Sequence, residues 1–155
     1  MYWARWAGDI TRAQMDGSDR VQIVTGLGTP IGLAIDYDGS RLFWAEFSGN
    51  KVCSSNLDGS DIRTIVQLAA GVGPCGIALH GNQIYWGNYY GMSVQSSLKA
   101  GQNVKMLYKG TSYVQHLATA TRNLSVTRPN PCKGRYCSDI CVLTVTSFRC
   151  TPPPT

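Results

Sequence analysis

The sequence predicts an all-β fold in which a four-stranded unit is repeated. Residues 15–24 read MDGSDRVQIV and residues 57–66 read LDGSDIRTIV, so nearly the same turn recurs 42 positions later. Asp-Gly between apolar runs is a strong hairpin signal, because glycine takes the positive φ that a tight turn needs. A repeat period in the forties is typical of the four-stranded blades of β-propellers.

The rest of the unit recurs with the turn. A motif of an apolar residue, an aromatic residue, tryptophan and a small residue occurs three times, and Pro-x-Gly-[Ile/Leu]-Ala precedes its second and third copies. The third copy of the turn keeps only Gly101, the residue that the turn geometry requires. The copies of the first motif are residues 1–4, 42–45 and 84–87, and those of the second are residues 30–34 and 74–78.

Each unit is expected to supply four short strands. Charged residues make up only 15% of the chain, and no stretch has the 3.6-residue periodicity of an amphipathic helix. The expected strands are residues 2–5, 9–15, 20–25, 31–36, 41–46, 51–57, 62–67, 76–80, 83–88, 93–98, 104–108 and 114–121.

The charge pattern narrows the class of partner. The formal net charge is +5, but the basic residues stand singly until a looser group between Arg122 and Arg149. The sequence predicts neither a recognition helix nor a basic aromatic sheet. The scattered basic residues therefore exclude nucleic acid as the partner and favour an acidic protein. No apolar run is long enough to cross a bilayer, so no direct membrane contact is expected. The chain enters a strand motif at Met1 without a secretory leader, which indicates a longer parent protein.

Four cysteines crowd the C-terminal segment as C-x4-C-x3-C-x8-C. Zinc sites usually show C-x2-C pairs or nearby histidines, so disulfides and an oxidising, extracellular compartment are the better interpretation. A glycosylation sequon at Asn123 agrees with that compartment. Cys53 and Cys75 do not belong to the repeat pattern, and they are expected either to pair with each other or to remain buried thiols.

Together, the aromatic-Trp strand, the LDGS turn and the P-x-G-[IL]-A strand resemble the class B, or YWTD, repeats of the low-density lipoprotein receptor family. The cysteine segment resembles the EGF-like domain that follows such propellers. The resemblance implies a three-blade half of a six-bladed propeller over residues 1–122, a linker over 123–131 and a truncated EGF-like module over 132–155. The pairing implied for this module is Cys132 with Cys141 and Cys137 with Cys150.

The chain departs from the family motif at the aspartate position, whose side chain in the family helps to link neighbouring blades. Thr-Asp follows Tyr-Trp in the family, whereas the Asp position here holds Arg5, Glu46 and Asn88. Glu46 and Asn88 can still accept hydrogen bonds, but Arg5 cannot and needs an acidic partner if it is buried. We therefore expect the tie to be lost or altered in all three blades.

The repeat also indicates where a ligand could bind. An aromatic residue follows each motif tryptophan by three positions, in the turn that leaves the strand. Aromatic residues near arginine are typical of interface hot spots, although each ring could instead pack on the adjacent blade. The candidate ligand-binding residues are Trp6, Phe47, Tyr89, Tyr90, Met92 and Arg5. The motif residues Trp3, Trp44 and Trp86 are assigned to the core between blades.

A calcium-dependent propeller hydrolase is the alternative from another class. Such a site needs several oxygen ligands converging from several blades. Only Asp36, His80 and His116 are titratable near the expected inner strands, and each is interpreted as a polar residue at a strand end. No catalytic residue, cofactor or metal is expected, including calcium in the EGF-like module. The expected function is extracellular protein binding in a receptor of the endocytic or Wnt co-receptor type, or in a matrix protein of nidogen type.

Three blades leave two open faces. The final expected strand, 114–121, has no outer strands after it, and the first blade has no inner strand. Either a missing N-terminal half of the propeller covers these faces, which we favour, or a second copy completes a homodimer of six blades.

Overall fold

The computed structural model describes residues 1–119, 140–143 and 148–151, which fall in two units, Met1–Thr119 and Ala120–Thr155. The described residues form strands, turns and loops, without a helix. The strands of the first unit are β1 (Tyr2–Arg5), β2 (Asp9–Arg12), β3 (Val21–Val24), β4 (Pro30–Asp36), β5 (Arg41–Glu46), β6 (Lys51–Asn56), β7 (Arg63–Gln67), β8 (Pro74–His80), β9 (Gln83–Asn88), β10 (Ser93–Leu98) and β11 (Lys105–Lys109).

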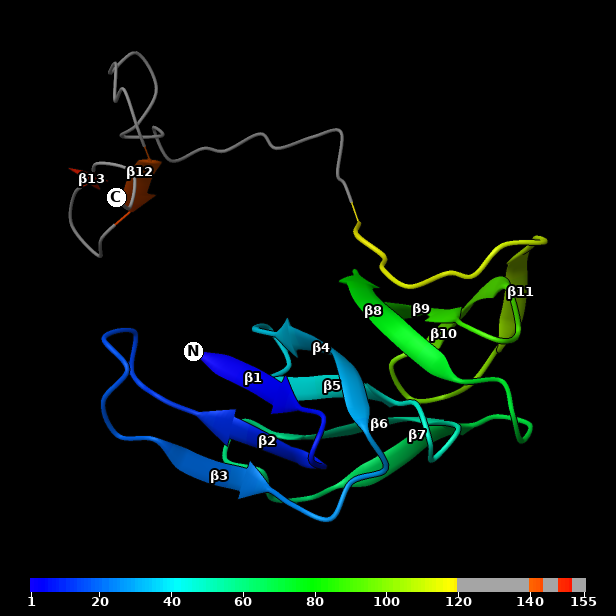
Figure 1. Ribbon diagram of the computed structural model, residues 1–155, viewed down its shortest axis with the longest axis horizontal. Helices are drawn as coiled ribbons and strands as arrows, with labels where there is room; N and C mark the ends of the chain where they lie inside the picture. Colours follow the sequence, from blue (N-terminus) through cyan, green and yellow to red (C-terminus); the bar gives the residue numbers. More distant parts are fainter. Residues whose placement is uncertain (120–139, 144–147, 152–155) are drawn as a thin grey trace. The chain divides into compact units, whose positions relative to one another are not determined.

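These strands make three antiparallel meanders, which we call blades 1, 2 and 3 (Figure 1). Blade 1 has the order β1-β2-β3, blade 2 the order β4-β5-β6-β7, and blade 3 the order β8-β9-β10-β11. The predicted all-β fold of repeated blades is confirmed. The fourth strand expected for the first unit is β4, which opens the sheet of blade 2, so blade 1 has three strands.

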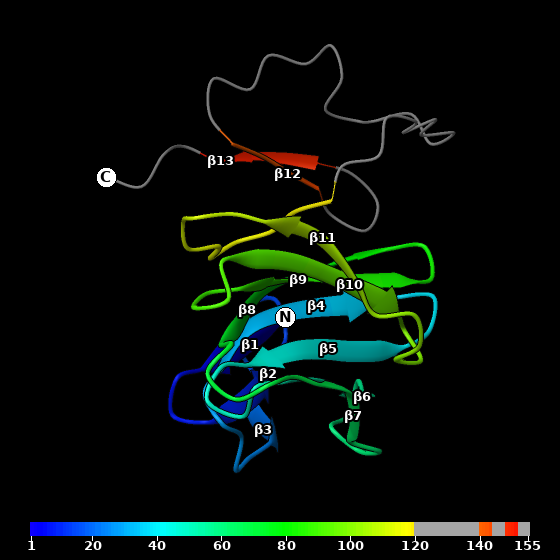
Figure 2. The ribbon, with the colours of Figure 1, turned by 90° about the vertical axis from the view of Figure 1, so that its right-hand side faces the viewer.

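The core lies between the blades, because alternate residues of a strand point to opposite faces of its sheet. Leu42 and Trp44 of β5 pack toward Ile10 and Val24 of blade 1. Phe43, between them in sequence, packs with Val52 and Val66 toward blade 3. Figure 2 shows the strands of blade 3 layered over β4 and β5. Blade 2 is therefore covered on both faces.

The repeated Asp-Gly turn fits each blade onto the one before it. Gly59 has φ 88°, and a Cβ there would lie 2.0 Å from the carbonyl oxygen of Ile23 in blade 1. Gly101 also has φ 88°, and its Cβ would lie 2.3 Å from the carbonyl oxygen of Ile65 in blade 2. Glycine is thus required at each of these turns for two reasons. The backbone is left-handed there, and a strand of the neighbouring blade approaches too closely to leave room for a Cβ.

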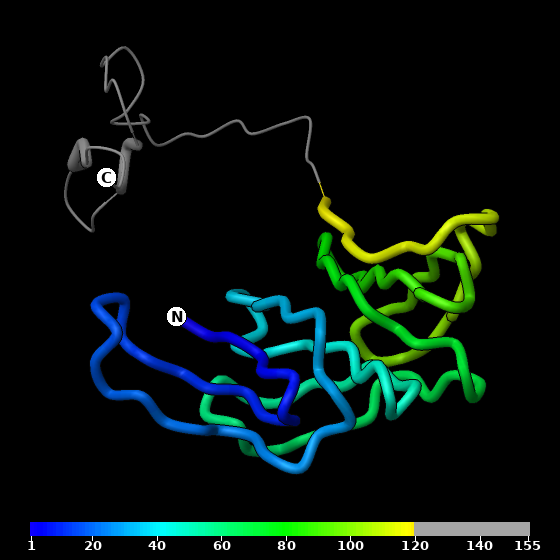
Figure 3. Tube along the Cα trace, viewed as in Figure 1, coloured from blue at the N-terminus to red at the C-terminus, as the bar shows by residue number. Residues whose placement is uncertain are grey.

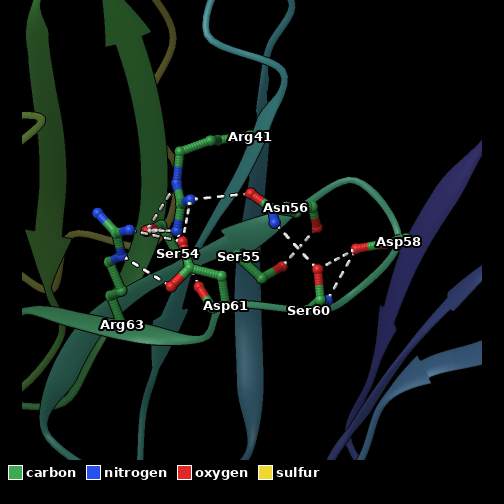
Figure 4. A network of polar contacts seen from close by, with 8 residues as sticks. All are labelled: Arg41, Ser54, Ser55, Asn56, Asp58, Ser60, Asp61 and Arg63. Atoms are coloured by element: carbon green, nitrogen blue, oxygen red, sulfur yellow. Dashed lines mark hydrogen bonds and ion pairs between the residues drawn. The ribbon is translucent and has the colours of Figure 1, made fainter.

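Arg41 stabilises the Asp-Gly turn of blade 2 through side-chain hydrogen bonds. Its guanidinium donates to Ser54 Oγ (2.9 Å), Asn56 Oδ1 (3.0 Å) and Asp61 Oδ2 (2.9 Å), as Figure 4 shows. Arg63 also donates to Asp61, with 3.0 Å between Nε and Oδ1. Hydrogen bonds from Arg63 and Arg41 lower the pKa of the Asp61 carboxyl.

The strand expected at residues 114–121 is absent from the described part of that segment, which ends at Thr119. Residues 114–119 nevertheless lie beside β8 (Figure 3), because Gly76 N donates to Gln115 O (3.1 Å) and Thr119 Oγ1 to Leu79 O (2.9 Å). The segment runs alongside β8 as β8 runs alongside β4. It makes no strand ladder, because no further sheet in the described residues pairs with it.

In the second unit the described residues form one hairpin, β12 (Ile140–Leu143) with β13 (Phe148–Thr151). Its register places Cys141 opposite Cys150. The predicted linker 123–131, the sequon at Asn123, and Cys132 and Cys137 lie outside the described residues, so the expected disulfide pairing stays a prediction.

Candidate functional site

Three of the predicted aromatic residues gather at one edge of the blades. Trp6, Phe47 and Tyr89 lie in the equivalent turns β1–β2, β5–β6 and β9–β10. They line a single cavity of about 460 Å³, into which the starts of β4 and β8 and the segment 114–119 also project. The cavity is lined by Trp6, Ile31, Phe47, Cys75, Tyr89, Tyr90, Gln115 and His116. We call these residues the aromatic site.

Backbone hydrogen bonds fix two of the three turns. Phe47 N donates to Thr29 O (3.0 Å), and Tyr89 N donates to Gly73 O (2.8 Å). Thr29 and Gly73 belong to the loops that enter the inner strands of blades 2 and 3. No inner strand of blade 1 is among the described residues, and Trp6 N makes no hydrogen bond there equivalent to those of Phe47 N and Tyr89 N. Trp6 is accordingly 73% exposed.

Three of the aromatic rings pack against one another, and Trp6 stands apart from them. Phe47 meets Tyr89 edge-on, with 6.0 Å between ring centroids, and this contact joins blades 2 and 3. Tyr90 contacts both rings, at 5.6 Å from Phe47 and 5.1 Å from Tyr89, although it remains 58% exposed. Tyr89 also stacks on Tyr113 at 4.3 Å with nearly parallel rings. Phe47 and Tyr89 therefore pack between blades, while Trp6 and part of Tyr90 are exposed to solvent.

Arg5 and Met92 do not line the cavity. The Arg5 guanidinium makes a bidentate ion pair with Asp9, with both N–O distances 2.7 Å. This contact raises the pKa of Arg5 and lowers the pKa of Asp9. The acidic partner expected for a buried Arg5 is thus present, although the arginine side chain itself is 48% exposed. Met92 lies in the β9–β10 turn with φ 47°.

Glu46 and Asn88, which stand at the position of the family's inter-blade aspartate, make different hydrogen bonds in blades 2 and 3. Glu46 accepts from Trp44 Nε1 (3.1 Å) and from Gly28 N (2.9 Å), and Lys51 Nζ lies 3.5 Å from its Oε2. In blade 3, Asn88 Nδ2 donates to Ser93 Oγ (3.0 Å). Trp86 Nε1 and Asn88 Oδ1 are both buried and have no hydrogen-bond partner among the described residues. The indole and side-chain oxygen that are joined in blade 2 are therefore not joined in blade 3.

The motif tryptophans also differ. Trp44 and Trp86 are completely buried. Trp3 is only partly buried and lines a second cavity, of about 330 Å³, together with Arg5, Thr11, Arg20 and Gln22. Among the described residues, no blade lies against the side of blade 1 that Trp3 occupies, and Trp3 is accordingly more exposed than Trp44 and Trp86.

Cys53 and Cys75 are free, buried thiols in different blades. Burial, followed by the charge of Glu46, raises the pKa of Cys53 to about 12. Burial also raises the pKa of Cys75, whose Sγ lies 2.7 Å from Val114 O. At neutral pH both groups are protonated and therefore poor nucleophiles.

The titratable residues of the inner strands do not converge. Asp36 pairs with Lys99 at 2.6 Å, while Ile31, at the other end of β4, lines the aromatic site. His80 ends β8, and His116 lies in the aromatic site. Within the described ranges, no three His, Cys, Asp or Glu side chains are grouped so as to hold a metal ion. The same residues include no helix that is long and apolar enough to cross a membrane.

Sequence reasoning missed Tyr113, Gln115 and Ile31 as neighbours of the aromatic turns. Ile31 and Gln115 were assigned to strands, and nothing in a strand pattern shows that their ends open into a common cavity. The only available signal was the Pro-x-Gly motif, because it predicts where each inner strand begins.

Comparison with known proteins finds relatives that match part of the chain. No protein-family model matches the chain. It is similar to the vitellogenin receptor of Solenopsis invicta, with 35% identity over 43% of this chain and 4% of that protein. It is also similar to low-density lipoprotein receptor-related protein 1 of Pyricularia oryzae, with 32% identity over 42% of this chain and 25% of that protein. The match to low-density lipoprotein receptor-related protein 5 of Mus musculus has 38% identity over 36% of this chain and 4% of that protein. The matches span a quarter or less of these relatives.

Solved structures share the fold. A chain of the nidogen/laminin complex superposes with a TM-score of 0.70 at 24% identity, over 79% of this chain and 48% of that one. Virginiamycin B lyase of Staphylococcus aureus superposes with a TM-score of 0.59 at 18% identity, over 70% of this chain and 36% of that one. Regucalcin, a calcium-binding protein of Agrobacterium tumefaciens, superposes with a TM-score of 0.61 at 14% identity, over 74% of this chain and 41% of that one. At these identities the likeness concerns the fold alone.

Proposed function

Since the repeats of this chain belong to the class B, or YWTD, type of the low-density lipoprotein receptor family, we propose that the segment binds a protein ligand outside the cell. The aromatic site is the proposed contact surface. The observation that carries the proposal is that Trp6 (73% exposed) and Tyr90 (58% exposed) both line one cavity of about 460 Å³. Large rings that remain exposed beside a hollow are what a partner can bury at little entropic cost.

Most of the site is fixed before a ligand binds. Backbone hydrogen bonds hold the turns of Phe47 and Tyr89, and their rings meet edge-on. Ring contacts with Phe47 and Tyr89 also hold Tyr90, although 58% of it is exposed. A fixed site with a few exposed anchors binds without large ordering costs. The ligand we propose inserts an apolar side chain here.

An acidic ligand is proposed for the chain as a whole and not for the aromatic site by itself. Most of the formal net charge of +5 lies in residues 120–155, because residues 1–119 hold nine Lys or Arg and eight Asp or Glu. No Lys, Arg, Asp or Glu is among the described residues that line the cavity. Complementary charge increases the association rate more than it increases affinity. Acidic residues of the partner would therefore act outside the contact made by its apolar anchor.

The curated relatives favour a receptor of the low-density lipoprotein receptor-related type, either endocytic or a Wnt co-receptor. A matrix protein of nidogen type is the second candidate, and it is favoured by the superposition on a chain of the nidogen/laminin complex. Both candidates use the same proposed site, so one binding experiment tests them together.

The test uses a phage-displayed peptide library as the probe. Peptides selected on the wild-type chain are measured by surface plasmon resonance on Trp6→Ala and Tyr90→Ala variants. Each substitution is expected to weaken binding by at least about tenfold, as for hot-spot aromatic residues. Tyr37→Ala is the matched control, because Tyr37 is 80% exposed in the turn after β4, at the end of that strand away from Ile31. Equal affinity of the selected peptides for all four chains would refute the proposed site.

A further inference from the structure

A cavity of about 380 Å³ lies between blades 2 and 3, at the edge of the sheets opposite the aromatic site. Asp36 ends β4 and Arg41 begins β5, whereas the aromatic site takes Ile31 from the other end of β4. We call this cavity the basic cavity. The lining residues that matter for its chemistry are Asp36, Arg41, Phe43, Arg63, Asn82 and Lys99.

Three cations line the basic cavity, and carboxylates of the described residues neutralise only two of them. Lys99, in the turn after β10, pairs with Asp36 at 2.6 Å, so this ion pair joins the walls that blades 2 and 3 supply. Arg41 and Arg63 share one carboxylate, that of Asp61 (Figure 4). The distances to Asp61 Oδ2 are 2.9 Å from Arg41 Nη1 and 2.7 Å from Arg63 Nη2. One positive charge is therefore left over beside the cavity.

The hydrogen-bonding groups that remain for a ligand are mainly donors. Arg41 contributes charge but no donor, because five hydrogen bonds occupy its five N–H groups. Arg63 contacts Asp61 through Nε and Nη2, and its Nη1 has no partner among the described residues. Lys99 Nζ has three N–H donors and one carboxylate partner. Of Asn82, only the backbone oxygen accepts a bond within the described part of the chain, from Lys99 N (3.0 Å).

The repeat does not require this cluster of cations. Arg63 and Lys99 are equivalent to Val21 and Leu57, which stand 42 positions earlier in the sequence. Leu57 packs against the apolar cluster between blades 1 and 2. The same place in the fold is therefore apolar between blades 1 and 2 and basic between blades 2 and 3. This difference indicates a local specialisation and not a requirement of blade packing.

An anion with several acceptor oxygens fits these groups. A sulfate or phosphate monoester has three terminal oxygens, which can accept from Arg63, Lys99 and Asn82 at once. Hydrogen bonds between such ionised partners are stronger than those between neutral groups. Phe43 and Ile65 add apolar surface, and the cavity volume falls in the range of about 300–1,000 Å³ that is usual for small organic ligands. We propose that the basic cavity binds the sulfate or phosphate ester of a sugar-sized molecule.

The test is a titration of the ¹⁵N-labelled 155-residue chain with glucose 6-sulfate and with glucose 6-phosphate, followed by NMR. The amide signals of residues 63–65, 82 and 99–100 should shift, while those of Trp6, Phe47 and Tyr89 should not. Unesterified glucose should bind at least about tenfold more weakly, because it lacks the charge. The ester that binds more tightly identifies the source of the oxyanion. No shift of these signals at ester concentrations up to about 10 mM would overturn the proposal, as would equal affinity for glucose.

Substitutions then locate the site. Arg63→Gln should weaken ester binding by at least about tenfold, because it removes a charged donor. The variant should fold, since the Arg63 side chain is 63% exposed and Arg41 still pairs with Asp61. Arg20→Gln is the matched control. It removes the same charge from an exposed arginine of blade 1, whose Nε donates to Gly17 O, and should change affinity by less than about twofold.

A neutral variant keeps the test independent of net charge. Asn82→Ala removes one uncharged donor from the basic cavity and should weaken ester binding by about threefold. Equal effects of Arg63→Gln and Arg20→Gln, together with no effect of Asn82→Ala, would show that the ester responds to the overall charge of the chain. That result would refute a site between blades 2 and 3.

Discussion

Blade 2 and its two neighbours are built from one repeat, yet within residues 1–119 only blade 2 has another blade packed on both of its faces. Trp44 is completely buried, while the equivalent Trp3 of blade 1 is partly exposed. Val66 is 7% exposed, while the equivalent Tyr108 of blade 3 is 57% exposed. The repeat therefore determines which side chain faces which side, whereas the neighbouring blade determines how much that side chain stabilises the fold.

The sharpest test of this difference is to remove the same ring in two blades. Trp44→Ala should lower the free energy of unfolding by about 3–5 kcal/mol, because it leaves a large cavity between blades 1 and 2. Trp3→Ala should cost less than half as much, because its ring already contacts solvent. Urea unfolding at a protein concentration where the chain is monomeric measures both. Equal losses would contradict the view that blade 1 is uncovered on the Trp3 side.

Blades 2 and 3 also differ in the polar group beneath the motif tryptophan. Glu46 is buried, accepts from Trp44 Nε1 and has Lys51 as a cation. Asn88 is equally buried, but Ser93 stands where blade 2 has Lys51. Asn88→Glu should therefore destabilise the chain by about 3 kcal/mol, because the new carboxylate is buried without a cation.

The matched control adds the missing cation. The Asn88→Glu, Ser93→Lys chain reproduces the Glu46 and Lys51 arrangement of blade 2, and it should recover at least half of the lost stability. A double-mutant cycle by urea unfolding gives the coupling between the two sites. A coupling near zero would mean that the lysine does not compensate the carboxylate, and that blade 2 is held by another contact.

Much of the fold was predictable, because the signals involved are local. Gly17, Gly59 and Gly101 recur where a positive φ is required, and the strands between them alternate apolar and polar residues. What depends on neighbouring blades was not predictable. Residues 114–119 have the pattern of a strand, but a strand needs a ladder of hydrogen bonds, and this segment accepts only the one backbone bond from Gly76 among the described residues. Trp3 looks the same as Trp44 in sequence, and only packing separates them.

The candidate site shows the same limit. The spacing of Trp6, Phe47 and Tyr89 predicts equivalent turns, and these turns do line one cavity. The stacking of Tyr89 on Tyr113 was not predictable, because Tyr113 lies outside the repeated motifs. The free state of Cys53 and Cys75 was left open as well, since pairing depends on distance between blades rather than on spacing in the sequence.

A smaller effect is expected where blade 1 lacks a neighbour at its turn. Gly59→Ala and Gly17→Ala both place alanine at a positive φ, which costs about 1–2 kcal/mol in either case. Only the Cβ at residue 59 would collide with a neighbouring carbonyl, that of Ile23. Gly59→Ala should therefore cost about 2 kcal/mol more than Gly17→Ala. The same urea series, in dilute solution, measures the difference, and equal costs would show that Ile23 moves away.

The smallest effect concerns acid stability. Hydrogen bonds from Arg63 and then Arg41 lower the pKa of Asp61 in the folded chain. A carboxyl whose pKa is lowered by folding stabilises the fold above its unfolded pKa, and this contribution is lost as the pH falls through the folded value. Stability of the wild-type chain should therefore fall as the pH drops below about 4. Asp61→Asn should make that decline shallower, because one of the titrating groups is gone.

Asp19 supplies the control for this measurement, because it holds the equivalent turn position in blade 1 and makes no ion pair with a described residue. Asp19→Asn should leave the acid slope closer to that of the wild-type chain than Asp61→Asn does. The slopes come from urea unfolding at several pH values between 2 and 5. If both variants flatten the decline equally, the arginine contacts of Asp61 do not distinguish blade 2 from blade 1. The difference between the blades then rests on their apolar contacts alone, since burial of Trp44 and Val66 does not change with pH.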